Sequence, residues 1–485
     1  MIKGRIKKTD TYTIETKMMF RPRRRRFGAR EMYSVETWFF LPVDMGINKR
    51  NYTKIDFYRE LKTYIKIDPP KVLLAEIANK EGEFMQSLKD AFSNFDPDNP
   101  ATLDNLNDLI LIFMNIMKKA VKREVRKIEI YKSGAEKQRV AGRLIKNLDI
   151  AIDDFRNNAG DIDAFKTERI ANTFKYSDEY ISNLKYRYIQ HVIFLLNKEK
   201  EKDTGLIQKL KTSLKKEIGH RKRYGFPIAS QSNKDNDKLL RRWDVVKYYV
   251  TNKLILNTKV DKEIKYIMEV LYSIAAGIAM IFATAVAFYY GKKYGNFTYG
   301  LFVVLVISYM FKDRIKEWGR NFFNTILKKQ MLDHRFNLYD NNGKKIGISN
   351  TGFNFIAKRD LPKEIYNIRY NINDEQIKTN EKIMKFTRKV KIHSKRMRNT
   401  FKSTKLRGIN DVLKFNFLPL TLRLEDPDVP IYLHNDDMDV KRINTQKTVP
   451  VNMILAIKYR NETIYHRYRL LINRNGIRKL KTIEI

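Results

Sequence analysis

Two charge-free apolar stretches lie almost back to back at residues 270–290 (VLYSIAAGIAMIFATAVAFYY) and 294–311 (YGNFTYGLFVVLVISYMF). An α-helix rises about 1.5 Å per residue, so these stretches would span roughly 27–32 Å, close to the hydrocarbon thickness of a bilayer. A short GKK turn separates them. The pattern predicts a central two-helix transmembrane hairpin. The competing interpretation is a helical hairpin buried inside a large soluble domain.

The charges around the two stretches predict an orientation in the membrane. Seven basic residues flank the outer ends, and two lie in the turn: Lys259, Lys262, Lys265, Lys312, Arg314, Lys316 and Arg320 outside, Lys292 and Lys293 inside. Because basic loops stay on the cytoplasmic side, we expect an integral membrane protein with both termini cytoplasmic.

Small residues recur every four positions along the first stretch, at Ala275, Ala279, Ala283 and Ala287, with Gly277 beside them. Such a face permits close approach of two helices in lipid, so these residues are the predicted packing face of the hairpin. The alternative is that the alanines simply favour a helix.

The charge of the chain points to an anionic partner. Its 485 residues contain 96 Lys and Arg against 55 Asp and Glu, a formal net charge of +41. Candidate partners are anionic lipid head groups, nucleic acid and an acidic protein. A lysine-rich coding bias would also explain part of this excess. Since the chain has no cysteine, disulfides, zinc–thiolate sites and thiol nucleophiles are excluded.

Arginine clusters are the predicted anion-binding residues because the guanidinium fork suits phosphate. They are Arg23, Arg24, Arg25, Arg26, Arg221, Arg223, Arg396 and Arg398. The alternative interpretation of any one cluster is an ordinary solvent-exposed surface that binds no anion.

The periodicity of the remaining chain predicts four regions. Residues 1–53 form a basic β-hairpin from strands at 11–20 and 31–42; residues 54–258 are helical. Residues 259–332 hold the transmembrane hairpin, with helices at about 266–290 and 294–311, and a juxtamembrane basic helix. Residues 333–485 are β-rich and end in an antiparallel meander. The predicted fold is thus a multi-domain membrane protein, mostly α in its N-terminal region. We also expect the N-terminal strands to join the C-terminal sheet, because two strands alone are marginally stable.

The helix expected at 105–130 has one apolar face, and its polar face carries Lys118, Lys119 and Lys122. The apolar face is typical of a helical-bundle core.

No catalytic motif accompanies these features. The six histidines form no HExxH pattern, and the chain has no Walker A loop and no GxSxG elbow. The patch at 434–439 (HNDDMD) is the richest in possible ligands, but it reads as an acidic loop. We therefore assign no catalytic residue and expect no metal or cofactor.

The sequence favours a non-catalytic binding, sensing or scaffolding protein, anchored by the hairpin and facing an anionic partner. One alternative is an effector that oligomerises through the hairpin and perturbs the bilayer. Another is a membrane-tethered hydrolase or nuclease whose site is assembled only in space.

Overall fold

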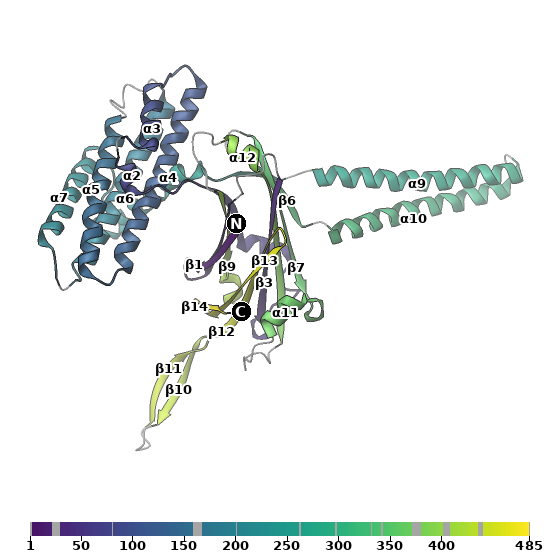
Figure 1. Ribbon diagram of the computed structural model, residues 1–485. Coiled ribbons are helices and arrows are strands. Elements are labelled where there is room, and N and C mark those ends of the chain that lie inside the picture. The colour runs from purple at the N-terminus through teal and green to yellow at the C-terminus, as the bar shows by residue number, and fades with distance from the viewer. Residues whose placement is uncertain are drawn as a thin grey trace.

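A central β-sandwich carries three projections in the computed structural model (Figure 1). The projections are a helical bundle, a long two-helix arm and a two-stranded ribbon. The structure describes all residues except 1, 22–29, 80, 159–166, 200, 261–262, 296–297, 331, 341–342, 371–379, 401–407, 435–439 and 485.

Two antiparallel sheets form the sandwich. The four-stranded sheet has the order β1 (Ile2–Lys8), β2 (Thr13–Phe20), β9 (Gly408–Asn416) and β4 (Leu61–Asp68). The eight-stranded sheet has the order β14 (Gly476–Ile483), β13 (Glu462–Asn473), β12 (Val449–Tyr459), β3 (Arg30–Pro42), β8 (Glu381–His393), β7 (Lys345–Ile356), β6 (His334–Tyr339) and β5 (Asn257–Val260).

Aromatic side chains fill the space between the sheets. Phe20 packs on Tyr33 with ring centroids 5.0 Å apart, and Phe39 packs on Phe415 at 5.3 Å. Phe57, on helix α1 (Lys54–Glu60), stacks on Phe353 at 4.0 Å. Each pair buries large apolar area, which is the main source of the sandwich's stability.

The expectation that the N-terminal strands join the C-terminal sheet is confirmed, because β3 pairs with both β8 and β12. The expected hairpin between the strands at 11–20 and 31–42 is wrong. β2 pairs with β1 and β9, whereas β3 is central in the other sheet. β3 is buried along nearly its whole length, so it needs cover on both faces and lies opposite β2 rather than beside it.

The predicted C-terminal meander is confirmed as β12–β13–β14, and β6 and β7 also pair with each other in an antiparallel arrangement. Short helices complete this part: α11 (Lys363–Tyr370), α12 (Ser394–Thr400) and α13 (Leu418–Thr421).

The helical bundle is inserted between β4 and β5. Its helices are α2 (Leu74–Ile77), α3 (Glu83–Ser93), α4 (Pro100–Ile130), α5 (Gly134–Asn158), α6 (Glu168–Leu196), α7 (Thr204–Arg223) and α8 (Asn233–Asn252). The N-caps of α7 and α8, Asp203 and Ser232, each accept a backbone N–H with their side chain. The bundle therefore occupies less than the expected region 54–258, because α1 and β4 belong to the sandwich.

The arm consists of antiparallel helices α9 (Glu263–Tyr294) and α10 (Tyr299–Gln330) and lies opposite the bundle (Figure 1). The central two-helix transmembrane hairpin predicted for this region is wrong. Within the described residues, one helix is long and apolar enough to cross a membrane, at Met268–Lys293. α10 begins at Tyr299, so its apolar part before Lys312 rises only about 20 Å, less than the roughly 30 Å required. The juxtamembrane basic helix expected within residues 259–332 is not a separate element, because α10 continues through this segment without a break.

The ribbon pairs β10 (Asp428–His434) with β11 (Val440–Gln446), and all its described residues are exposed. It extends away from the sandwich (Figure 1).

Candidate functional site

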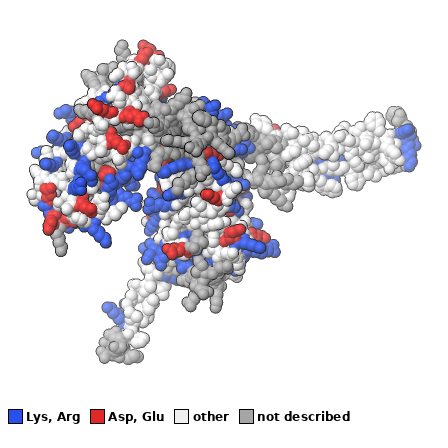
Figure 2. Space-filling view, viewed as in Figure 1, with Lys and Arg blue, Asp and Glu red and all other residues white. Residues whose placement is uncertain are grey.

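The arm exposes an extensive apolar surface, seen as the white projection in Figure 2. Its exposed large apolar residues include Val270, Ile274, Ile278, Met280, Ile281, Phe282 and Phe288 on α9, and Phe302, Val306, Tyr309, Met310 and Phe311 on α10. Three of them, at 280–282, are consecutive. Consecutive helical residues point about 100° apart, so the exposure wraps around α9 instead of forming one stripe.

The two helices of the arm contact each other through the predicted small-residue face. Ala275, Ala279 and Ala283 are buried against α10, whereas Ala287 is half-buried. Gly277 is exposed, and a Cβ added there would meet no atom within 4 Å. A Cβ added at Gly319 would lie 2.8 Å from the Cβ of Ala275, so these positions face each other.

This pairing fixes the level of the charges along the arm. Since the helices are antiparallel and Ala275 faces Gly319, Lys312 lies at about the level of Phe282. The tyrosine hydroxyl of Tyr272 donates to Oδ1 of Asn324 at 2.6 Å, in the same register. Beyond Phe282, toward the tip, both helices are apolar over about 15 Å; nearer the base, α9 lies beside the charged part of α10.

The structure places the predicted anion-binding arginines in different environments. Arg221 is fully buried, and it donates to Ser182 Oγ at 3.0 Å, to Asn183 Oδ1 at 2.9 Å and to the carbonyl of Pro227. These bonds fix the loop after α7 and leave Arg221 no access to an external anion.

The remaining predicted arginines are exposed or outside the description. Arg223 is exposed at the end of α7, and Arg396 is exposed on α12, donating to the Lys345 carbonyl. Arg23, Arg24, Arg25 and Arg26 lie outside the described residues, as do the side chain of Arg398 and most of the 434–439 patch.

Lysines from three elements meet where the bundle joins the four-stranded sheet. Lys66 on β4 is repelled by Lys118 and Lys119 on α4 and by Lys17 on β2. Its Nζ donates to Oδ1 of Asn115 at 3.3 Å. Lys119 forms an ion pair with Asp68. No ion pair with a carboxylate joins Lys17, Lys66 or Lys118 within the part of the chain that the structure describes.

Burial and mutual repulsion act together on these lysines. Desolvation, followed by the charges of Lys118, Lys119 and Lys17, lowers the pKa of Lys66 to about 7, against the smaller opposing effect of Asp68. Desolvation and the charges of Lys247, Lys122 and Arg187 lower the pKa of Lys118 to about 8. A group of cations held this close favours any anion that enters it.

We use the name basic junction for Lys17, Lys66 and Lys118 with their neighbours Lys122, Arg187 and Lys247. Lys and Arg side chains gather where the bundle meets the sandwich in Figure 2. The sequence shows part of this group, since Lys118 and Lys122 lie on the polar face of one helix. Lys17 and Lys66 lie in separate strands, and no local sequence pattern links either of them to the lysines of that helix.

A second charged cluster lies inside the bundle. Arg156 pairs with Asp178 at 2.7 Å and with Glu217 at 2.9 Å, Lys185 pairs with Glu217 at 3.3 Å, and His220 Nε2 lies 2.7 Å from Asp178. Burial raises the pKa of Glu217, but Arg156 and Lys185 outweigh it and lower that pKa to about 2. These groups satisfy one another, so the cluster holds α5, α6 and α7 together.

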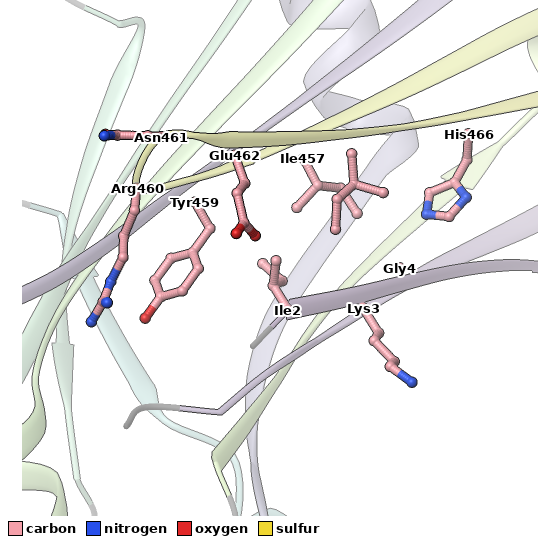
Figure 3. Close-up of a pocket in the computed structure, with 10 residues that line it drawn as sticks. Ile2, Lys3, Gly4, Ile457, Tyr459, Arg460, Asn461, Glu462 and His466 are labelled. Carbon is pink, nitrogen blue, oxygen red and sulfur yellow. The ribbon is translucent and has the colours of Figure 1, made fainter. Parts of the chain in front are cut away.

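A pocket of about 780 Å³ opens between β1 and the β12–β13 turn (Figure 3). Ile2, Ile457 and Ile464 contribute apolar walls. Glu462 and His466 lie on opposite sides of Ile457, so they do not form an acid–base pair (Figure 3). Among the described residues, no group of three or more His, Asp or Glu side chains is placed to hold a metal ion.

No protein-family model matches this chain, and neither a curated protein nor a solved structure matches it.

Proposed function

We propose that this chain is a membrane-bound, non-catalytic binding protein whose arm inserts into a lipid bilayer and whose basic body binds an anionic partner. The observation that supports it best is the apolar surface that surrounds the outer part of the arm. An exposed apolar patch on a monomeric soluble protein rarely exceeds a few hundred Å². A helix that is apolar all round requires an apolar solvent on all sides, and lipid supplies one.

The charges of α10 fit insertion with the tip first. The basic residues in the middle of α10 (Lys312, Arg314, Lys316 and Arg320) lie beside residues 274–282 of α9, at the level where head-group phosphates would meet them. With Lys312 at the head groups, the tip reaches only about 15 Å into the bilayer, so Lys292 and Lys293 oppose insertion instead of favouring it. Met268–Lys293 of α9 is the segment with the length and composition of a membrane span.

The small-residue face is a point against the oligomerising effector. Ala275, Ala279 and Ala283 are already buried against α10 of the same chain, so they do not offer a face to a second copy. For a metal-dependent hydrolase or nuclease, the described residues offer no group of three or more His, Asp or Glu side chains that could hold a metal ion.

Liposome flotation of the full chain tests the proposal. We expect wild-type protein to float with vesicles, and the double variant Ile281→Asp/Phe288→Asp to remain at the bottom, because it places two carboxylates on the lipid-facing surface. The matched control is Leu240→Asp/Tyr248→Asp on α8, where both side chains are also exposed. Equal flotation of the arm and control variants, or no flotation of wild type, would refute insertion by the arm.

A further inference from the structure

We infer that the anionic partner is a nucleic acid, bound through its phosphate backbone along the basic junction and the adjoining outer face of the four-stranded sheet. This inference rests on the proposed function, in which the basic body binds an anionic partner. The residues that carry it are separate from those of the arm.

The strand register extends the basic junction across the sheet. Arg5 is opposite Lys17, Lys17 is opposite Val412, and Val412 is opposite Tyr64, so all four side chains share one face. Alternate residues of a strand point to the same side. The same face therefore carries the basic residues Lys3, Arg5 and Lys7 of β1, Lys17 of β2, Lys414 of β9, and Lys62 and Lys66 of β4.

Few carboxylates neutralise this face. Glu15 pairs with Lys7 at 3.0 Å and with Lys414 at 3.7 Å, and Asp68 pairs with Lys119. Lys3, Arg5 and Lys62 are exposed, whereas Lys17 and Lys66 are half-buried. The result is a basic surface that passes from β1 across the sheet to α4.

The bundle continues the surface at its other end. Lys118 is close enough to Lys122, Lys247 and Arg187 for their charges to lower its pKa. Arg187 lies over the ring of Trp243 at 4.6 Å, which holds its guanidinium in place. Together these side chains form a continuous basic track, to which β1, β2, β4, α4, α6 and α8 each contribute cations. A chain of evenly spaced phosphates can neutralise several of these cations at once.

The position of the track disfavours lipid as its ligand. A helix of the arm's length extends about 48 Å, and the bundle lies on the opposite side of the sandwich from the arm (Figure 1). With the arm tip in a bilayer, the bundle side of the basic junction is separated from that bilayer by the sandwich and the length of the arm.

The composition of the face disfavours a protein partner. Protein interfaces depend on exposed aromatic or aliphatic anchors. On this face Val412 is buried and Tyr64 and Met19 are only half-exposed, while the exposed side chains are cations. With few rings available to stack on bases, we expect binding to the backbone with little sequence preference.

The test is fluorescence anisotropy of full-length protein with labelled mixed-sequence oligonucleotides, single-stranded and duplex, over a salt series. The junction variant Lys17→Gln/Lys66→Gln/Lys118→Gln should bind at least 10-fold more weakly. Its slope of log K against log salt should be smaller than that of wild type by about 2 on single strands. The matched control, Lys211→Gln/Lys215→Gln/Lys216→Gln, removes the same charge from exposed positions on α7 and should change affinity less than 2-fold.

A substitution with arginine keeps the test independent of folding defects. The variant Lys17→Arg/Lys118→Arg keeps both positive charges and should bind the oligonucleotides with near wild-type affinity. Equal losses in the junction and control variants would show that net charge alone drives binding and would overturn the inference. Tighter binding of polyglutamate than of either oligonucleotide would overturn it in favour of an acidic protein.

Flotation separates this inference from the proposed function. The junction variant should float with liposomes as wild type does, and Ile281→Asp/Phe288→Asp should bind the oligonucleotide normally. Protein that binds nucleic acid through the basic junction but never floats would refute the membrane proposal and leave the inference intact.

Discussion

The lowered pKa values in the basic junction predict that anion binding takes up protons. The pKa of Lys66 is lowered to about 7 and that of Lys118 to about 8, so both lysines lose charge between pH 6.5 and 8.5. A bound phosphate favours the charged form of each lysine and raises its pKa toward 10.5. Affinity should therefore be highest in mild acid and fall as the pH rises through the two lowered values.

The size of this effect follows from the two values. If the bound anion restores the ordinary pKa of 10.5, affinity falls from pH 6.5 to 8.5 by about 25-fold through Lys66 and about 4-fold through Lys118. Together these factors give a change of about 100-fold. Incomplete restoration of either pKa would make the change smaller.

The assay is oligonucleotide anisotropy at constant ionic strength, in half-unit steps of pH. Lys66→Gln removes the larger contribution, so its change in affinity over this range should be only about 4-fold. Lys62→Gln, an exposed lysine on the same strand and face, should weaken binding slightly but keep the wild-type change. Affinity of the wild type that stays constant between pH 6.5 and 8.5 would refute the reasoning, as would the same change in Lys66→Gln.

Three further predictions concern stability and the arm. Glu217→Gln leaves Arg156 and Lys185 without their buried carboxylate and should lower the free energy of unfolding by about 3–5 kcal/mol at pH 7 in urea titrations. The pKa of Glu217 is lowered to about 2 from 4.5, so this stabilisation is complete above about pH 4.5 and is lost as the pH falls toward 2. The unfolding free energies of wild type and Glu217→Gln should therefore converge in acid. Asp411→Asn removes the carboxylate that joins the sheets, which lies 2.9 Å from Arg388 and 3.0 Å from the Tyr33 hydroxyl. The free energy of unfolding should fall by about 3–5 kcal/mol in the same urea titration. An unchanged unfolding midpoint would mean that the ion pair of Asp411 with Arg388 contributes nothing to stability. Gly319→Val places a side chain against Ala275 and should speed amide exchange in α9, whereas Gly277→Val meets open space and should not; equal exchange rates would disprove the close contact.

Local patterns in the sequence predicted the elements that depend on neighbours along the chain. The alternation of residues 449–485, with turns at 460–462 and 474–476, predicted the meander, because antiparallel neighbours joined by short turns need no distant partner. The three- and four-residue spacing of apolar residues in 105–130 predicted α4 for a similar reason.

The same patterns failed where an element's surroundings decide its role. The strands at 11–20 and 31–42 were predicted to form one hairpin, but β2 pairs with β1 and β9, and β3 pairs with β8 and β12. The apolar stretch at 294–311 matched a membrane span in length, but helix α10 begins only at Tyr299 and continues into a charged segment. Composition did not show where that helix would begin.

The sequence by itself determined that this chain is strongly basic, that it has no thiol chemistry, and that its centre carries a long apolar helix. Charge and hydropathy belong to residues one at a time, so they can be read without a fold. Only the tertiary structure decided that Lys17, Lys66 and Lys118 lie together, because they belong to two strands and a helix far apart along the chain. Their proximity, and the lowered pKa values that it causes, arise from packing that no local pattern records.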